Sequence, residues 1–229
     1  MNRYSELEKN IGIEFTDKKM LDMAFIHKSY VNEHKDKKME YNERLEFLGD
    51  AVLELVVTDF LYKTFPEQKE GVMTNWRSAL VQGKHLAEIA IELNLGVYLY
   101  LSRGEEHSGG RKKNYILANT LEALIGAIYL DKGYETAHHF IHEFILKRLE
   151  DILAKGLHID AKSRFQELSQ DLLGITPEYR VLKEEGPDHN KSFTMGAYIG
   201  DELIGEGQGS SKQKAEQEAA QAALKKKNW

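Results

Sequence analysis

The stretch from residue 42 to residue 55 combines an apolar sequence with four acidic side chains. Drawn as an α-helix, it is apolar around most of its circumference, which is typical of a helix buried at the centre of a protein. The acidic residues recur at spacings of three, four and four, so they form a single stripe along that helix. They are Glu43, Glu46, Asp50 and Glu54.

This stripe is costly to fold. Stacked like charges repel one another even on an exposed helix, and burial raises the cost to several kcal/mol for each ion unless a cation or a proton neutralises it. An ion pair with Lys or Arg usually explains one such acid, and it explains Glu43 and Glu54 most easily. Arg44 or a partner chain could supply the cation for Glu43. For the stripe as a whole we favour a bound metal ion.

A second segment, from residue 116 to residue 130, is also nearly all apolar and places Asn119 and Glu122 three residues apart on one face. Small residues in the two segments would let the two helices pack closely; they are Gly49, Ala51, Ala123 and Gly126. Such packing would bring four oxygen donors together, namely Glu46, Asp50, Asn119 and Glu122. An all-oxygen set with three negative charges suits Mg²⁺ or Mn²⁺ rather than zinc or copper.

The chain as a whole reads as two domains. Residues 1–155 show helical periodicity in long segments and no sustained strand pattern, so we expect a mainly α domain. The predicted helical segments are Leu21–Tyr30, Glu43–Tyr62, Met73–Leu93, Ile116–Leu130 and Glu135–Leu153. Residues 156–160 serve as a linker to a second domain over residues 161–229.

The second domain is predicted to be a small α+β domain of order α-β-β-β-α. An amphipathic helix opens it, with Phe165, Leu168, Leu172 and Leu173 on one face. Strands are predicted over residues 179–183, 192–199 and 202–206, and the middle one alternates cleanly between apolar and polar residues. A final helix runs from about Ser210 into a Lys-rich end.

Composition narrows the function classes. The chain has no Cys, which excludes disulfides, thiolate nucleophiles and Cys-ligated metal sites. Nothing resembles a signal peptide or a membrane-spanning stretch, so we expect a cytoplasmic protein with no membrane partner. The formal net charge of -6 argues on its own against a nucleic-acid partner. Placement of charge matters more than the total, however, because phosphate contacts need only a few well-placed cations.

Residues 42–53, NERLEFLGDAVL, resemble the signature of the ribonuclease III family. Further family motifs follow in the expected order: FIHKSY at 25–30, EGVM at 70–73 with Arg77, GGR at 109–111, and EALIGA at 122–127. The segment GQGSSKQKAE at 207–216 resembles a double-stranded-RNA-binding domain. The resemblance covers nearly the whole chain, in the short bacterial arrangement of a nuclease domain followed by an RNA-binding domain.

The resemblance implies an Mg²⁺-dependent endoribonuclease that cuts both strands of an RNA duplex and leaves 5′-phosphate and 3′-hydroxyl ends. Glu46, Asp50 and Glu122 match metal-binding carboxylates of the family, with Asp50 and Glu122 the most critical for catalysis. Glu43 and Glu70 match auxiliary acidic positions. The family also implies a homodimer, for which Phe25, Phe47 and Leu48 are candidate apolar contacts, and it implies ribosomal RNA precursors and some messages as substrates.

Asn119 departs from the family pattern, which usually has Asp at this position. An amide oxygen can still ligate Mg²⁺, but the site loses one negative charge, so we predict weaker metal binding with the chemistry retained. The alternative is a catalytically impaired protein that only binds double-stranded RNA. A carboxylate-bridged redox metalloprotein is disfavoured because Glu-x-x-His pairs are absent from the expected places.

Candidate RNA contacts come from three separated elements of the second domain, as recognition of the wide minor groove of A-form RNA requires. They are Gln166 and Glu167 on its first helix, Pro187 and His189 in the loop between the first two strands, and Ser211, Lys212 and Lys214 at the start of its last helix. Residues 159–229 carry 10 Lys and Arg against 12 Asp and Glu. We therefore predict that binding leans on shape and 2′-hydroxyl contacts as well as on salt-sensitive phosphate contacts.

Overall fold

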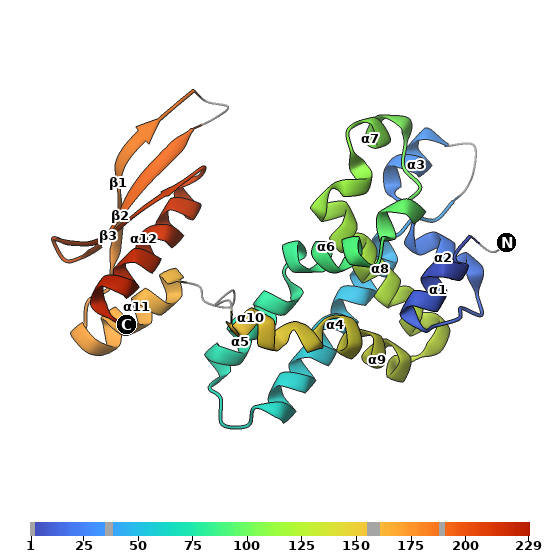
Figure 1. Cartoon of the computed structure of the whole chain (residues 1–229), viewed down its shortest axis with the longest axis horizontal. Helices are drawn as coiled ribbons and strands as arrows, with labels where there is room; N and C mark the ends of the chain where they lie inside the picture. The colour runs from blue at the N-terminus through green and yellow to red at the C-terminus, as the bar shows by residue number, and fades with distance from the viewer. Residues whose placement is uncertain (1–2, 35–38, 155–160, 188–190) are drawn as a thin grey trace. The chain divides into compact units, whose positions relative to one another are not determined.

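The structure is a computed structural model that describes residues 3–34, 39–154, 161–187 and 191–229. The chain forms two compact units, Met1–His158 and Ile159–Trp229, and each is described here by itself. The predicted linker over residues 156–160 and the candidate RNA contact His189 lie outside the described residues. Figure 1 labels the helices and strands used below.

The first unit is helical, as predicted. Its α-helices are α1 (Ser5–Ile11), α2 (Lys18–Ala24), α3 (Lys28–Glu33), α4 (Glu43–Thr64), α5 (Glu70–Val81), α6 (Gly83–Glu92), α7 (Arg103–His107), α8 (Asn114–Lys132), α9 (Tyr134–Phe144) and α10 (Leu149–Ala154). Single 3₁₀ turns cover η1 (Leu95–Tyr98), η2 (Gly110–Lys112) and η3 (Leu146–Arg148). Helices α4 and α8 pack against each other at the centre, and α6 covers another side of α8.

Three of the predicted helical segments are interrupted. The segment Met73–Leu93 divides into α5 and α6 because Gln82 adopts an extended backbone, with φ -61° and ψ 139°. The segment Leu21–Tyr30 divides in the same way at His27, whose extended backbone starts α3. The segment Glu135–Leu153 becomes α9, η3 and α10. Helices α5, α6, α9 and α10 all contribute buried residues to the same core, which explains the continuous periodicity of those two segments, whereas α3 buries none of its residues.

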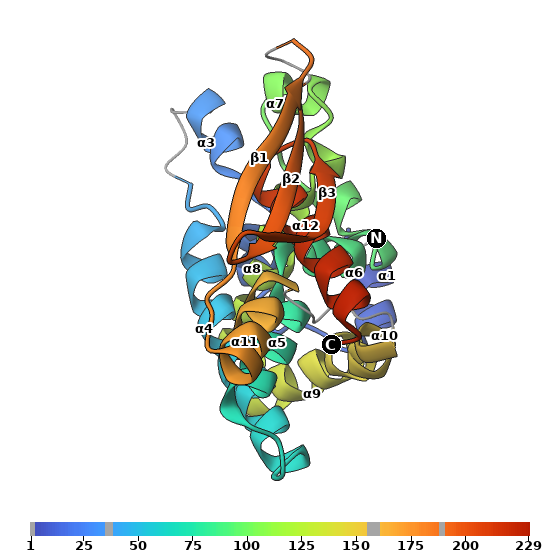
Figure 2. The same ribbon diagram turned by 90° about the vertical axis from the view of Figure 1, so that its left-hand side faces the viewer.

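The second unit consists of α11 (Ala161–Leu173), β1 (Glu178–Glu185), β2 (Ser192–Ile199), β3 (Glu202–Gly209) and α12 (Lys212–Lys227). The strands form an antiparallel sheet in the order β1-β2-β3, which Figure 2 shows side by side. The predicted α+β order is therefore confirmed. The first and third strands are longer than predicted: each spans eight residues, seven of which pair with β2 around a register shift.

Helix α12 lies unusually close to β3, and glycine makes this possible. Added Cβ atoms on Gly205 and Gly207 would lie within 2.5 Å of α12 backbone atoms. The facing positions of the helix are alanines at helical spacing, and Ala215, Ala219 and Ala223 are fully buried. The start of α12, where RNA contacts are predicted, is thus fixed rigidly against the sheet.

The predicted apolar face of α11 is only partly correct. Phe165 is fully buried and Leu168 packs against the core, but Leu172 and Leu173 are exposed. The buried face instead continues from Phe165 to Ser169, which is buried and donates a hydrogen bond to the carbonyl oxygen of Ile175. The last turn of the helix therefore lies outside the core, just before the chain turns at Gly174.

Candidate active site

The close contact of α4 with α8 depends on two glycines. A Cβ atom on Gly49 would lie 1.8 Å from the carbonyl oxygen of Glu122, and one on Gly126 would lie 2.3 Å from that of Leu45. Any side chain at either position would force the helices apart. Gly49 and Gly126 therefore act as predicted, whereas Ala51 is exposed and takes no part in this contact.

This packing brings together the four residues that the sequence singled out. The side-chain amide of Asn119 donates a hydrogen bond to Oε1 of Glu46 across the helix pair, at 2.8 Å. Burial raises the pKa of Glu122 to about 7, and the negative charges of Asp50 and then Glu46 act in the same direction. Burial also raises the pKa of Glu46, against the effect of the hydrogen bond from Asn119. The cluster is thus a site of concentrated negative charge.

The two ends of the acidic stripe are neutralised by cations, but its middle is not. Glu43 pairs with Lys28 at 2.9 Å and Glu54 with Arg77 at 3.2 Å, so the ion-pair prediction holds for both. The partner of Glu43 is Lys28 and not Arg44, which instead lies 3.9 Å from Glu40.

Within the described residues, no Lys, Arg or His forms an ion pair with any of the three carboxylates of the cluster. These are Glu46, Asp50 and Glu122. The middle of the stripe is therefore the part that an added cation would stabilise most.

The cluster is open rather than a finished cage. As the side chains stand, no three His, Asp or Glu groups in the described part of the chain are arranged to hold a metal ion. Asp50 is exposed and Glu122 is half-buried, so both carboxylates can turn toward an ion that enters from solvent. Asn119 uses its nitrogen on Glu46, which leaves its Oδ1 for another partner. The donor set of carboxylate and amide oxygens fits a hard divalent cation.

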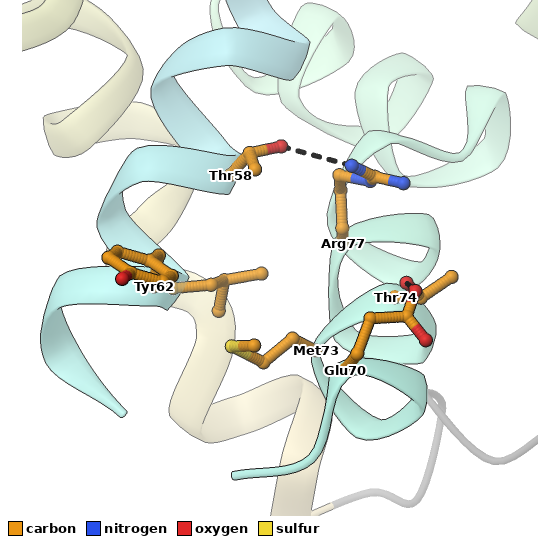
Figure 3. Close-up of a pocket in the computed structure, with 7 residues that line it drawn as sticks. Thr58, Tyr62, Glu70, Met73, Thr74 and Arg77 are labelled. Carbon is orange, nitrogen blue, oxygen red and sulfur yellow. Dashed lines mark hydrogen bonds between the residues drawn. The ribbon is translucent and has the colours of Figure 1, made fainter. Parts of the chain in front are cut away.

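Glu70 lies apart from this cluster. It begins α5, and its Oε1 accepts a hydrogen bond from the Thr74 hydroxyl at 2.9 Å. It lines a cavity of about 240 Å³ between α4 and α5, shown in Figure 3. Arg77, on the same cavity, donates to the Thr58 hydroxyl at 3.1 Å. Glu70 is not among the groups whose charge shifts the pKa of Glu46 or Glu122.

The three candidate dimer contacts differ in burial. Phe25 is fully buried and its ring lies 5.5 Å from those of Tyr4 and Tyr98, so the prediction that it contacts another subunit is wrong. It fills the core instead. Phe47 is 80% exposed, which is exceptional for so large an apolar side chain. It lines a groove of about 820 Å³ whose other apolar residues include Met20, Met23, Met39, Leu48 and Leu130, and whose charged residues are Glu40, Glu43 and Arg44.

The candidate RNA contacts that the structure describes all lie at the surface. Gln166 and Glu167 are exposed on α11, and Pro187 is exposed after β1. Ser211 caps α12, because its hydroxyl accepts a hydrogen bond from the backbone amide of Lys214.

The two lysines at the start of α12 are also exposed. The ammonium of Lys212 lies 5.7 Å from the centre of the Phe193 ring, and that of Lys214 lies 3.3 Å from the Ser210 hydroxyl. The helix start thus presents two cations beside free amide groups, an arrangement that favours phosphate.

Comparison with known proteins agrees with both units. Residues 17–149 match the family model described as Ribonuclease-III-like, and residues 161–227 match the double-stranded RNA binding motif. Ribonuclease 3 of Chloroflexus aurantiacus is 47% identical over 225 residues, which cover 97% of this chain and 91% of that protein. Ribonuclease 3 of Enterococcus faecalis is 47% identical over 221 residues, covering 96% of each chain.

The chain belongs to the ribonuclease III family. It is an endoribonuclease of that family that carries a double-stranded-RNA-binding domain. Its nuclease region is also similar to a solved nuclease domain of ribonuclease III from Campylobacter jejuni, with 45% identity and a TM-score of 0.59. The match covers 63% of this chain and 97% of that one, and that structure concerns a region involved in dimer formation.

Lys28 is a residue near the site of this ribonuclease III family member that the sequence pattern did not indicate. Lys28 reaches the acidic stripe from α3 and is close enough to act on Glu46 as well as Glu43. No spacing rule connects it to α4, because the two helices are separate elements. Its position within the FIHKSY motif was the only sequence feature that linked it to the site.

The part of the chain that the structure describes contains no helix with the length and hydrophobicity of a membrane span.

Proposed function

We propose that this endoribonuclease cleaves both strands of double-stranded RNA with Mg²⁺ bound at the acidic cluster, and that Mn²⁺ can substitute. The observation that carries the proposal is the uneven neutralisation of the stripe on α4. Cations hold its two ends, whereas Glu46, Asp50 and Glu122 share a partly buried region without one. A divalent cation provides the missing charge.

In this proposal Asp50 and Glu122 are the catalytic residues, and Glu46 and Asn119 complete the metal site. When bound, Mg²⁺ supplies the positive charge that activates water and stabilises the charge developing on the phosphate. The chain contributes a rigid base, because the Gly49 contact fixes the turn of α4 that carries Asp50 against the turn of α8 that carries Glu122. Cleavage yields 5′-phosphate and 3′-hydroxyl ends.

RNA is held by the second unit through its three surface elements. Gln166 and Glu167 offer hydrogen bonds to 2′-hydroxyls, and Pro187 with His189 belongs to the loop that meets the minor groove. Ser211, Lys212 and Lys214 receive phosphate at the start of α12. We assign residues 1–155 to the nuclease domain, 156–160 to the linker and 161–229 to the RNA-binding domain.

The proposed assembly is a homodimer of the nuclease domain, so that two sites cut the two strands. Its anchor is Phe47, which is exposed beside a mainly apolar groove of the same surface. A two-fold interface is self-complementary, so the exposed ring of one protomer can enter the groove of its partner. The substrates we propose are ribosomal RNA precursors and some messenger RNAs, in the cytoplasm.

The second candidate is a catalytically impaired protein that binds double-stranded RNA. It is favoured by one observation: Asn119 directs its amide nitrogen, rather than an oxygen, at the cluster. Incubation of a labelled RNA duplex with Mg²⁺ separates the two. The first proposal expects cleavage by the wild type and a loss of about 10³-fold or more in Asp50→Asn or Glu122→Gln, with RNA affinity unchanged. Equal activity in all three proteins would overturn the assignment of the site.

A further inference from the structure

We propose that His138 and His142 form a binding site for a divalent transition-metal ion of the imidazole-binding class, which includes Zn²⁺. Both residues lie on α9, four positions apart, so their side chains leave the same face of the helix one turn apart. Two imidazoles at this spacing are a recurring way to hold zinc on a helix. This site is separate from the acidic cluster and plays no part in the proposed cleavage.

The two rings are close neighbours on the surface of α9. Their centroids are 6.5 Å apart and their planes differ by only 20°. With zinc–nitrogen bonds of about 2.0–2.1 Å, two coordinated imidazoles have centroids on the order of 5–6 Å apart. Metal binding requires rotation about the side-chain torsions that brings the rings nearer and turns one nitrogen of each toward a common point, which the broad second torsion of His permits.

Aromatic neighbours restrict the side-chain motion of both His138 and His142. Phe60 on α4 makes a T-shaped contact with His142, with ring centroids 6.0 Å apart and an interplanar angle of 79°. Tyr134 lies on the other side of His138, with ring centroids also 6.0 Å apart. Both imidazoles are half-buried, so they lose less freedom on binding a metal than fully exposed side chains would.

The ring nitrogens are available. Neither His138 nor His142 forms a hydrogen bond or an ion pair with any other described residue. The nearby Glu143 is engaged by Lys147 at 2.7 Å, and no third His, Asp or Glu completes a cluster here among the described residues. The site therefore has two protein ligands, and water fills the other positions.

The ligand type restricts the class of metal ion. Neutral imidazole nitrogens favour Zn²⁺, Ni²⁺ and Cu²⁺, whereas Mg²⁺ prefers oxygen ligands. The two metal sites of the chain thus select different ions, and Mg²⁺ in the assay buffer does not compete for α9. Zinc bound across one turn of α9 stabilises the folded state by mass action.

The test is a calorimetric titration of the tag-free full chain with ZnCl₂ in the presence of Mg²⁺. The variants are His138→Gln and His142→Gln, and the matched control is His139→Gln, an exposed histidine on the same helix. We expect the wild type and the control to bind one Zn²⁺ per chain at this site. Each of the two test variants should bind that ion at least about tenfold more weakly.

A second readout guards against misfolding of the variants. Circular dichroism and thermal melting in EDTA establish the fold of each protein, and Zn²⁺ should raise the melting temperature of the wild type and of His139→Gln but not of the test variants. If His142→Gln loses its contact with Phe60 and unfolds, His138→Gln carries the test alone. Zinc binding that is unchanged in folded His138→Gln, or that is abolished by Glu122→Gln instead, would overturn the proposal.

Discussion

Asn119 on α8 donates its side-chain amide to Oε1 of Glu46 on α4, at 2.8 Å. The interaction replaces what would be a repulsion if both residues were acidic. It orients Glu46 and relieves part of the negative charge of the cluster in the absence of metal. The same amide contributes no negative charge toward a bound cation. Asn119 therefore stabilises the metal-free protein and lowers the affinity of the cluster for a metal ion.

Asn119→Asp should therefore destabilise the metal-free protein. It removes a hydrogen bond to a carboxylate and adds a like charge beside it, with an expected loss of roughly 1–2 kcal/mol in the free energy of unfolding. Thermal or urea denaturation in EDTA measures this. Asn114→Asp is the control, because Asn114 is the exposed first residue of α8, where a negative charge interacts favourably with the helix dipole. Equal effects of the two substitutions would contradict the role of Asn119.

The raised pKa of Glu122 gives the metal-free protein a characteristic dependence on pH. Its pKa is about 7 in the folded state and 4.5 in the reference state, so the folded protein binds the proton more tightly. Its contribution to stability is complete below about pH 4.5 and is lost as the pH rises through 7, by at most roughly 3 kcal/mol.

Denaturation of the wild type and Glu122→Gln in EDTA across this pH range measures the contribution of Glu122 together with its coupling to Asp50 and Glu46, since groups outside the cluster titrate equally in both proteins. The stability difference between the two proteins should change in favour of the variant as the pH rises. A stability difference that is independent of pH between 4.5 and 7 would show that the pKa of Glu122 is not raised in the folded protein.

Phe47→Ala should weaken the proposed dimer without unfolding the protomer. An exposed aromatic anchor that fills a groove contributes about 2 kcal/mol or more to association, which corresponds to about 30-fold in the dissociation constant. Sedimentation equilibrium measures this change. Leu55→Ala is the control, because Leu55 is also exposed on α4 but does not line the groove.

Phe25→Ala should instead destabilise the protomer, because Phe25 is fully buried in the core. The expected decrease in the free energy of unfolding is about 3–5 kcal/mol.

Lys212→Ala combined with Lys214→Ala should reduce both RNA affinity and its dependence on salt. Each phosphate contact that is lost lowers the slope of log affinity against log salt by about 1. The wild-type slope should itself be modest, because few cations reach the RNA. Lys225→Ala at the far end of α12 is the control and should leave the slope unchanged. A double variant with the wild-type slope would place the phosphate contacts elsewhere.

Most of the architecture follows from local patterns in the sequence. The 43–64 and 114–132 helices are long and apolar around most of their circumference, and Gly49 and Gly126 permit their close contact. The convergence of Glu46, Asp50, Asn119 and Glu122 could therefore be predicted. The alternation of β2 likewise predicted the burial of Met195, Ala197 and Ile199, although Gly196 on the opposite face is buried as well.

What the patterns missed depends on which neighbours a residue meets in three dimensions. Phe25 and Phe47 are the same residue type on helical segments, yet one fills the core and the other is exposed. Leu172 continues the apolar face of α11 but lies in a last turn that the core does not reach. Lys28 neutralises Glu43 from a different helix. None of these outcomes is encoded by spacing within one segment.

The central claim is that the acidic cluster binds Mg²⁺ and that Asn119 weakens this binding without abolishing catalysis. Single-turnover cleavage of an RNA duplex across a Mg²⁺ titration, for the wild type and Asn119→Asp, tests it most directly. We expect both proteins to reach comparable maximal rates, with the variant reaching half its maximum at a lower Mg²⁺ concentration. Absence of cleavage by the wild type at every Mg²⁺ and Mn²⁺ concentration would contradict the account.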